Sequence, residues 1–456
     1  MTALWTSEEA QGATLGTPGR AFEVGGLSID TRTLKPGDMF VALKGDARDG
    51  HDFVKAAFEA KAGAALVSYE PPGVGHDAAL LTVANTLRGL EDLARAARAR
   101  SNAKIVAVTG SVGKTTTKEI LRVAMGALGQ THASAASYNN HWGVPLSLAS
   151  LPREAKYGIF EVGMNHFGEI RSLVSFVRPH VAMVTAIAPA HLEFFVTCEA
   201  IADAKSEIFE GLVPGGAAIV PSDSPYTDRL VARARQARVG RVLTFGRKAG
   251  SDARLIAYDE RDEGAVVKAD ICGTPVEFRI GAPGLHIAGN AVGALLAVAM
   301  AEGDVLNAAA ALRSFAALKG RGEKLNVGGV GIIDESYNAN PASMAAALAV
   351  LAAAKGRRIA VLGDMLELGA DSLAHHAALA APIDAARADL VFASGPEMRA
   401  LWDSLPASRR GGYAATSAEL APLVTAAVKD GDTVLVKGSN GSKMSVIVDA
   451  LKKRGA

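Results

Sequence analysis

A strand, a glycine-rich turn and a helix follow one another in the segment IVAVTGSVGKTTTKEIL, residues 105–121. Residues 105–109 form a short apolar run rich in β-branched side chains, which is typical of a buried parallel strand. The run after the turn contains no Gly or Pro, which favours a helix. A buried strand that passes through a tight turn into a helix predicts an α/β fold with a doubly wound parallel sheet.

The turn itself predicts a phosphate-binding loop. Its glycines let backbone N–H groups approach phosphate oxygens, and Lys114 is placed to reach the β- and γ-phosphates of a nucleotide. The hydroxyl of Thr115 is placed to ligate the accompanying Mg²⁺. The commonest form of the motif has Gly where this chain has Val108, so the loop is a shortened variant. A chance lysine after a glycine turn is the alternative, but the flanking strand and helix favour ATP binding. The expected binding residues are Gly110, Ser111, Val112, Gly113, Lys114, Thr115 and Thr116.

Length and charge limit what else the chain can be. Its 456 residues are too many for a single hydrophobic core, so several domains are expected. The 48 basic and 47 acidic side chains leave a net charge of +1, which gives no electrostatic case for nucleic-acid binding. Two cysteines fit a reducing compartment rather than a disulfide framework. The N-terminus lacks the pattern of a signal peptide and no apolar stretch reaches membrane-spanning length, so we expect a cytoplasmic enzyme.

The order of strand-like and helix-like stretches predicts three domains. A small α/β domain is expected at residues 1–100, a central doubly wound domain at 101–318 and a Rossmann-like domain at 319–456. The Gly-rich, charged segment 318–329 is interpreted as the linker to the third domain. Short alternating strands at 253–280 predict a small β insertion.

The strands and helices expected within the larger domains follow from apolar periodicity. The central strands are expected at 105–109, 157–161, 181–187, 217–220 and 242–245, and the central helices at 169–177, 198–210 and 290–301. The C-terminal strands are expected at 331–334, 359–362, 390–393 and 434–437, and the helices at 342–354, 373–381, 417–429 and 442–452. The third domain has no GxGxxG after its first strand, so a dinucleotide role is not expected.

Ligands bind beyond the carboxyl ends of parallel strands, which makes strand ends the candidates for chemistry. Glu161 ends one predicted strand and His191 follows another, so the pair is predicted to hold a divalent cation beside the phosphate loop. Lys205 shares a helical face with apolar residues, and from the residues alone it is interpreted as a snorkelling side chain with its head in water. Asp334 ends a predicted strand, where a ribose contact and a polar group that ties down the next turn are equally favoured.

Two acidic and two histidine side chains cluster later in the chain, and the interpretation favoured for them is a solvated helix face. Hard Mg²⁺ sites rarely use paired histidines, which argues against a metal there. The four residues are Asp364, Glu367, His375 and His376.

Several motifs together resemble the Mur ligases, and within that family the members that join D-alanyl-D-alanine to UDP-N-acetylmuramoyl-tripeptide with ATP. They stand in the family's order between residues 109 and 439. The motifs are TGSVGKTTTKE, YNNHWGVPL, EVGMNHFGEI, AHLE, AKSEIF, DESYNANPASM, LGDMLELG and LVKGS.

The resemblance implies a role for each matching residue. Lys114 and Thr115 would hold the ATP phosphates and Mg²⁺. The further metal ligands would be Glu161, His191 and Lys205, the last as a carbamate. The implied catalytic residues are Lys114, Lys205 and His191. Asn290 would contact adenine, Arg321 phosphate and Asp334 ribose. Asp30, Thr31 and Arg32 would bind the UDP end. The C-terminal domain would bind the incoming dipeptide, and a monomer is expected.

The chain departs from the family pattern at three places, which concern adenine and substrate contacts rather than phosphate or metal. Ile287 follows His286 where the family has Asn, Asn440 replaces the arginine of KGSR, and Ala186 replaces an Asn. Three alternatives stay open: a sister ligase that adds a single amino acid, an enzyme like folylpolyglutamate synthase, and a P-loop ATPase switch.

Overall fold

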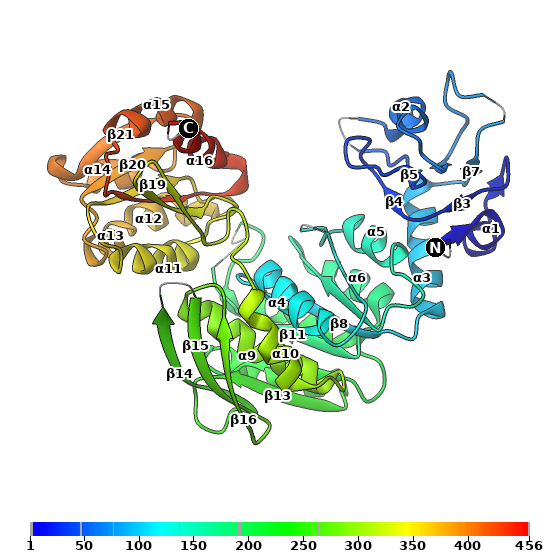
Figure 1. The fold of residues 1–456 in the computed structure, drawn as a ribbon, viewed down its shortest axis with the longest axis horizontal. Helices are drawn as coiled ribbons and strands as arrows, with labels where there is room; N and C mark the ends of the chain where they lie inside the picture. The colour runs from blue at the N-terminus through cyan, green and yellow to red at the C-terminus, as the bar shows by residue number, and fades with distance from the viewer. Residues whose placement is uncertain are drawn as a thin grey trace.

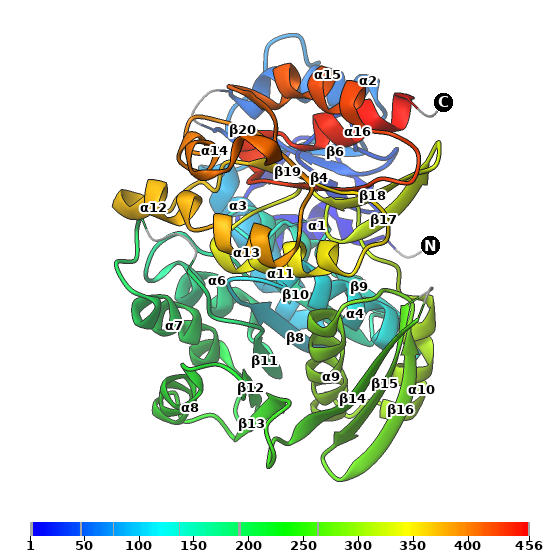
Figure 2. The same cartoon turned by 90° about the vertical axis from the view of Figure 1, so that its left-hand side faces the viewer.

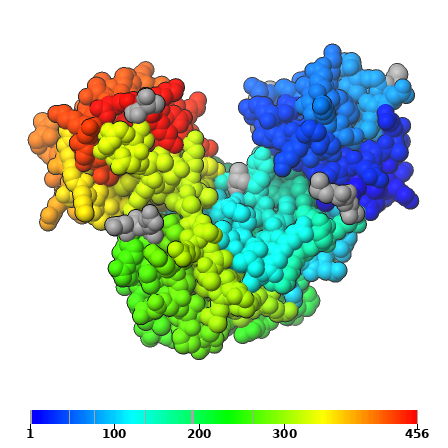
Figure 3. Space-filling view, in the orientation of Figure 1, coloured from blue at the N-terminus to red at the C-terminus, as the bar shows by residue number. Residues whose placement is uncertain are grey.

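The computed structural model describes residues 3–45, 48–75, 77–135, 137–189, 193–261 and 264–454. Three α/β units follow one another along the chain, and the central unit lies below and between the other two (Figure 1). The surface is hollowed between the N-terminal and C-terminal units, above the central one (Figure 3). Within the described part of the chain, no helix has the length and apolar character that crossing a membrane requires.

The central sheet has nine strands in the order β16-β15-β14-β13-β12-β11-β8-β10-β9. From β9 to β14 neighbouring strands are parallel, as the sequence predicts. Its parallel strands are β8 (Lys104–Thr109), β9 (Thr131–Ala133), β10 (Tyr157–Glu161), β11 (Val181–Val184), β12 (Ala217–Pro221), β13 (Arg241–Gly246) and β14 (Ala253–Arg261).

Helices cover both faces of this sheet, because side chains of a buried parallel strand alternate between two apolar surfaces. Ile105 and Ala107 of β8 pack into one core, and Val106 and Val108 into the other. On the first face lie α5 (Gly143–Ala149), α6 (Glu169–Val177), α7 (Cys198–Ser206) and α8 (Thr227–Gln236). On the second face lie α4 (Lys114–Gly126), α9 (Leu285–Met300) and α10 (Val305–Ala311), side by side in Figure 1.

The predicted β insertion is a continuation of the sheet rather than a separate element. β14 pairs in parallel with β13 and antiparallel with β15 (Gly264–Ile271), which pairs with β16 (Thr274–Ile280). The three strands form the outer edge of the sheet beside α9 (Figure 2). The strand predicted at 181–187 ends at Val184, and α9 begins five residues before the predicted 290.

The C-terminal unit is a six-stranded sheet with helices on both faces. Its strand order is β17-β18-β22-β19-β20-β21, and only β17 is antiparallel to its neighbour. The strands are β17 (Glu323–Val327), β18 (Val330–Glu335), β19 (Arg358–Gly363), β20 (Leu390–Ser394), β21 (Arg410–Ala414) and β22 (Thr433–Lys437). The helices are α11 (Pro341–Ala352), α12 (Ser372–Ala377), α13 (Ala380–Ala385), α14 (Arg399–Ser404), α15 (Ser417–Ala427) and α16 (Ser445–Arg454).

Two predictions for this unit are wrong in their bounds. The segment 318–329 is not all linker, because residues 323–327 form β17. The turn into β18 is Gly328–Gly329, both with positive φ (56° and 77°), as a two-residue hairpin favours. The helix predicted at 373–381 is divided into α12 and α13, because Pro382 has no N–H to donate to the preceding turn.

The N-terminal unit contains a five-stranded sheet of order β2-β7-β6-β5-β4 and a two-stranded ribbon, β1 with β3. The strands are β1 (Trp5–Thr6), β2 (Thr17–Pro18), β3 (Glu23–Val24), β4 (Leu27–Ser28), β5 (Met39–Val41), β6 (Ala64–Val67) and β7 (Leu80–Thr82). The helices are α1 (Ser7–Thr14), α2 (Val54–Glu59) and α3 (Thr86–Arg100). Helix α3 packs on α5 and α6 and thereby joins this unit to the central one.

Trp5 fastens the N-terminal ribbon to the central unit. Its side chain is 1% exposed, its indole N–H donates to the Ala149 carbonyl at 2.9 Å, and Arg100 lies 3.8 Å above its ring. We expect Trp5→Ala to lower the free energy of unfolding by about 3–5 kcal/mol through the cavity it leaves. Trp5→Phe keeps most of the packing and should cost about 1–2 kcal/mol for the unpaired carbonyl. Urea denaturation measures both, and equal midpoints for wild type and Trp5→Ala would contradict the assignment.

Candidate active site

The glycine turn approaches its neighbours so closely that only glycine fits. Gly110 and Gly113 have positive φ angles of 155° and 87°, which L-residues with a side chain rarely adopt. A Cβ on Gly110 would overlap the Thr185 hydroxyl, and one on Gly113 would lie 2.9 Å from the Asn290 amide nitrogen. Thr185, just after β11, holds the turn by donating its hydroxyl to the Val112 carbonyl at 2.6 Å. The backbone of residues 110–113 is therefore set by β11 on one side and α9 on the other.

Helix α4 begins at Lys114 with Gly113 as its N-cap, so its free N–H groups point toward the turn. The Lys114 ammonium donates to the Gly110 carbonyl at 2.6 Å and so lies over the turn. Burial lowers the pKa of Lys114, and the nearby Glu161 carboxylate opposes that effect. The turn thus has the geometry that a phosphate loop needs, with N–H groups, a helix N-terminus and a lysine at one place.

Glu161 ends β10 directly beside this loop. Its side chain is 1% exposed, and it accepts hydrogen bonds from the Thr115 hydroxyl at 2.7 Å and the Asn139 amide at 2.6 Å. The structure thereby brings together two of the residues predicted to ligate metal. Asn139 was missed as a site residue, although it stands within the motif YNNHWGVPL.

Lys205 lies in the last turn of α7 and is 1% exposed. Its interpretation as a snorkelling lysine is therefore wrong, because its head is enclosed by protein. Burial, and secondarily the charge of Lys114, lowers the pKa of Lys205 well below its usual range. His191, the other predicted metal ligand, lies outside the described residues. Within those residues no three His, Cys, Asp or Glu side chains gather into a metal-binding group.

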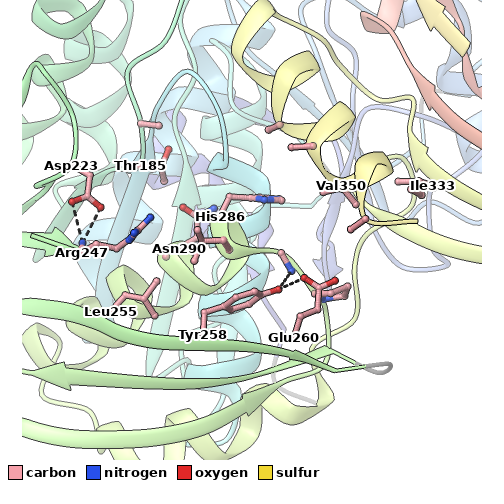
Figure 4. A pocket seen from close by; sticks show the side chains of 18 of the residues that line it. Thr185, Asp223, Arg247, Leu255, Tyr258, Glu260, His286, Asn290, Ile333 and Val350 are labelled. Atoms are coloured by element: carbon pink, nitrogen blue, oxygen red, sulfur yellow. Dashed lines mark hydrogen bonds between the residues drawn. The ribbon is translucent and has the colours of Figure 1, made fainter. Parts of the chain in front are cut away.

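A cavity of about 840 Å³ opens beside the loop, between the carboxyl ends of the central strands and the C-terminal unit (Figure 4). Asn290 and His286, one turn apart on α9, line it together with Thr185 and Ala186. Asp223 and Arg247 line the opposite side, where the Asp223 carboxylate accepts from the Arg247 backbone N–H at 2.8 Å. The sequence did not predict three further cavity residues, Asp223, Arg247 and Tyr258. They follow or lie on three different strands, and none belongs to a local motif.

Arg321 reaches from the C-terminal unit to the loop region. Its guanidinium donates to the Ser137 hydroxyl at 3.2 Å and packs 3.8 Å above the Tyr337 ring. The Ser137 hydroxyl in turn lies 3.4 Å from the Thr115 hydroxyl. Asp334 does not line the cavity. Its carboxylate is fully buried and accepts from the Gly320 N–H at 3.1 Å and the Ser336 hydroxyl at 2.6 Å, as expected for a group that ties down a turn.

The cluster after β19 is not a solvated helix face throughout. Asp364 and His376 are buried, at 5% and 0% exposure, and burial raises the pKa of Asp364. The Met365 N–H donates to Nε2 of His376 at 2.9 Å, so Nδ1 carries the proton and donates to the Ser372 carbonyl at 2.8 Å. Asp364 and His376 therefore bind backbone groups of neighbouring segments. Of the four residues in the cluster, only Glu367 is exposed.

The three departures from the family pattern fit their surroundings. Ile287 is 3% exposed within the apolar core around α9. Ala186 contributes its backbone carbonyl, which accepts from the Ser111 N–H at 2.8 Å. Asn440 opens a short 3₁₀ turn after Lys437, whose ammonium donates to the Asn338 carbonyl at 2.9 Å.

In the N-terminal unit, Asp30 and Arg32 form a local pair. The Arg32 guanidinium donates to both carboxylate oxygens and lowers the pKa of Asp30 to about 2. Asp30 also accepts from the Arg32 backbone N–H at 2.9 Å. This unit lies across the hollow from the C-terminal one (Figure 3).

Three family models match the chain in sequence: "Mur ligase family, catalytic domain" at residues 23–107, "Mur ligase middle domain" at 108–298 and "Mur ligase, glutamate ligase domain" at 320–440. The UDP-N-acetylmuramoyl-tripeptide–D-alanyl-D-alanine ligase of Rickettsia prowazekii is 34% identical over 424 residues, 93% of this chain and 94% of that protein. The crystal structure of MurF from Acinetobacter baumannii aligns with a TM-score of 0.85 at 30% identity, over 98% and 99% of the chains. MurF of Thermotoga maritima, solved with ADP, aligns at 0.78 and 25% identity, over 94% and 97%.

The turn geometry predicts that nucleotide affinity depends on Gly113. Gly113→Ala places a Cβ against Asn290 in a left-handed conformation that costs about 1–2 kcal/mol, so we expect ATP affinity to fall about tenfold. Gly126→Ala is the matched control, because it lies at the other end of the same helix with no atom within 4 Å of the added Cβ. Calorimetric titration with ATP measures both. Equal affinities for Gly113→Ala and wild type would exclude the turn as the phosphate site.

Proposed function

The chain belongs to the Mur ligase family, and we infer that it joins D-alanyl-D-alanine to UDP-N-acetylmuramoyl-tripeptide at the expense of ATP, in peptidoglycan precursor synthesis. The observation that carries this inference is the glycine turn at the end of β8, with Glu161 and Lys205 buried near it. It stands in a chain that matches UDP-N-acetylmuramoyl-tripeptide–D-alanyl-D-alanine ligases over nearly its whole length. It is an ATP-dependent peptide ligase with a three-domain α/β architecture.

We assign residues 1–100 to the UDP end of the substrate, 101–318 to ATP and 319–456 to the incoming dipeptide. Asp30, Thr31 and Arg32 would bind the UDP end. The residues Gly110, Ser111, Val112, Gly113, Lys114, Thr115 and Thr116 would cradle the phosphates of ATP. The cavity lined by Asn290 has the size of a small-molecule site and would take the adenine.

The residues beside the loop fit a Mg²⁺ ion. Glu161 is a buried carboxylate whose hydrogen-bond partners among the described residues are the neutral Thr115 and Asn139 side chains. Hard oxygen ligands of this kind are those that Mg²⁺ prefers. Mg²⁺ would neutralise charge on the β- and γ-phosphates, held by Thr115 and Glu161 with His191 and a carbamylated Lys205.

The reaction proceeds through an acyl phosphate. The terminal carboxylate of the tripeptide attacks the γ-phosphorus of ATP, and ADP leaves. The amine of D-alanyl-D-alanine then attacks the activated carbonyl, loses a proton and expels inorganic phosphate. Lys114 would stabilise the charge that develops on the transferring phosphoryl group, and Arg321 would approach it from the third domain. The contribution of the chain is positioning and charge neutralisation.

The ribose contact of Asp334 stays a prediction. Its carboxylate oxygens accept hydrogen bonds from the Gly320 N–H and from the N–H and the hydroxyl of Ser336. A monomer that works in the cytoplasm also remains our proposal. ATP as a substrate and two unpaired cysteines, Cys198 and Cys272, support the compartment.

Phosphate release in the presence of each UDP-muramyl-peptide, with and without D-alanyl-D-alanine, tests the function. We expect release only when the tripeptide and D-alanyl-D-alanine are both present, together with formation of the UDP-linked pentapeptide. A sister ligase would accept a single amino acid instead, and a folylpolyglutamate synthase-like enzyme would accept glutamate with a folate. A P-loop switch would hydrolyse ATP without an acceptor amine. Any of these results would replace the proposed reaction.

Lys205 is predicted to work as a carbamate. Its lowered pKa favours the neutral amine that adds to CO₂, and the product is an anion with two hard oxygens for Mg²⁺. Lys205→Ala should lose activity by about 100-fold or more, and short carboxylic acids should restore part of it. Lys104→Ala is the control, because its ammonium pairs with Glu302 at the far end of β8. Wild type in ¹³C-bicarbonate should show a carbamate resonance that Lys205→Ala lacks. An active wild type without that resonance excludes the carbamate.

Glu161→Gln is expected to raise the Mg²⁺ concentration for half-maximal activity by about tenfold, because it removes the buried charge and keeps the side-chain size. Glu302→Gln, which changes an exposed carboxylate, should leave the Mg²⁺ requirement unchanged. The measurement is a Mg²⁺ titration of ligation at saturating ATP. If Glu161→Gln and wild type give the same curve, Glu161 is not a metal ligand.

A further inference from the structure

A tyrosine at the edge of the central sheet forms a hydrogen bond with the N-cap residue of the helix that carries Asn290. The hydroxyl oxygen of Tyr258 on β14 accepts from the Gly284 N–H at 2.6 Å and donates to the Glu260 carboxylate at 2.7 Å (Figure 4). Tyr258 and Glu260 are two positions apart on one strand, so their side chains share a face of the sheet. Tyr258 is half-buried and packs against the core around α9.

Gly284 is the N-cap of α9 and has no side chain to cap the helix. Its φ of 126° is one that only glycine adopts readily, and its carbonyl accepts from the N–H groups of Ile287 and Ala288. The backbone N–H of Gly284 donates its hydrogen bond to the Tyr258 hydroxyl oxygen. The Tyr258 hydroxyl therefore holds the N-cap from which the first turn of α9 starts, while the later turns pack in the apolar core.

That first turn faces the nucleotide site. His286 and Asn290 both line the cavity, and Asn290 lies against Gly113 of the phosphate loop. A shift of this turn would move the His286 side chain directly, and Asn290 follows it by one helical turn. Tyr258 lines the same cavity at its edge, beyond His286 (Figure 4).

The other partner of Tyr258 extends this connection to the third domain. Glu260 forms an ion pair with Lys324 of β17, with 3.7 Å between the nitrogen and the oxygen. Both side chains are 47% exposed. This pair joins β14 of the central sheet to the edge strand of the C-terminal sheet, just beyond the connection between the two units.

We propose that Tyr258 is a positioning residue for the base end of the nucleotide site, and that the Glu260–Lys324 pair links it to the C-terminal domain. The proposal rests on the proposed function, in which this cavity binds ATP. Tyr258 orders the α9 N-terminus through the Gly284 N–H, and Lys324 orders Tyr258 through Glu260. Burial raises the pKa of Tyr258 to about 12, so the hydroxyl stays protonated and keeps its donor role at working pH.

Tyr258→Phe removes only the hydroxyl and is the direct test. We expect the dissociation constant of ADP and the KM for ATP to rise about fivefold, which is the effect expected from the loss of one hydrogen bond. The kcat and the KM for D-alanyl-D-alanine should stay within about twofold. Tyr413→Phe is the matched control, because its hydroxyl also bonds a backbone group, the Gly395 carbonyl, and it does not line the cavity. Unchanged ADP affinity in Tyr258→Phe overturns the proposal, as does an equal rise of every KM.

A double-mutant cycle tests the link to the third domain. Lys324→Met should weaken ADP binding about twofold at low salt, since exposed ion pairs are weak, and the effect should vanish in 0.5 M KCl. In the Tyr258→Phe background Lys324→Met should have no effect. The same twofold loss in both backgrounds would overturn the link through Tyr258. ADP binding is measured without either cosubstrate, so a failed ligation assay leaves this test intact.

Discussion

The close approach of the glycine turn to β11 and α9 is the constraint on which the site depends. Gly110 lies against Thr185 and Gly113 against Asn290, with no room for a Cβ at either position. Both β11 and α9 are buried in the central cores, so the elements that contact the turn are themselves held in place by packing. A phosphate cradle needs N–H groups that already point at the ligand, and a packed turn provides them without ordering on binding. The cavity to which we assign the nucleotide then lies where the parallel strands end, as expected for the doubly wound topology.

Charge is unevenly distributed around this turn. Lys114 and Arg321 approach it, and the ammonium of the buried Lys205 is close enough for Lys114 to lower its pKa. Among the described residues, Glu161 is the carboxylate that opposes them at Lys114. Buried cations are stable only with anionic partners or in their neutral form. The arrangement is therefore complementary to a polyphosphate, and it gives Lys205 a physical reason to be present as a neutral amine or as its carbamate.

Local patterns in the sequence predicted the α/β fold, the strand ends at Thr109 and Glu161, and the glycine turn into α4, because each depends on a short contiguous run. Lys205 was misjudged from its helix alone, since the protein that encloses its head comes from elsewhere in the chain. The cavity residues Asp223 and Arg247 follow separate strands, and no single segment shows that they meet. Residues 323–327 read as linker because they are charged and adjoin glycines, whereas Leu325 and Val327 pack into the C-terminal core. Burial and register are set by tertiary packing, which overrides such local signals.

A 3₁₀ helix of the central unit ends at Ser314 and β17 begins at Glu323, so eight residues connect the second and third units. The last of them are bound to the C-terminal sheet. The Gly320 N–H donates to Asp334, and the Gly320 carbonyl accepts from the Tyr337 N–H. Arg321, the next residue, packs against the Tyr337 ring. Arg321 therefore moves with the third domain, and any rotation takes place before Gly320. The buried Asp334 therefore holds the backbone directly before Arg321, whether or not its carboxylate also meets a ribose. Through its hydrogen bond to Ser137, Arg321 also connects the third domain to the residues beside the glycine turn.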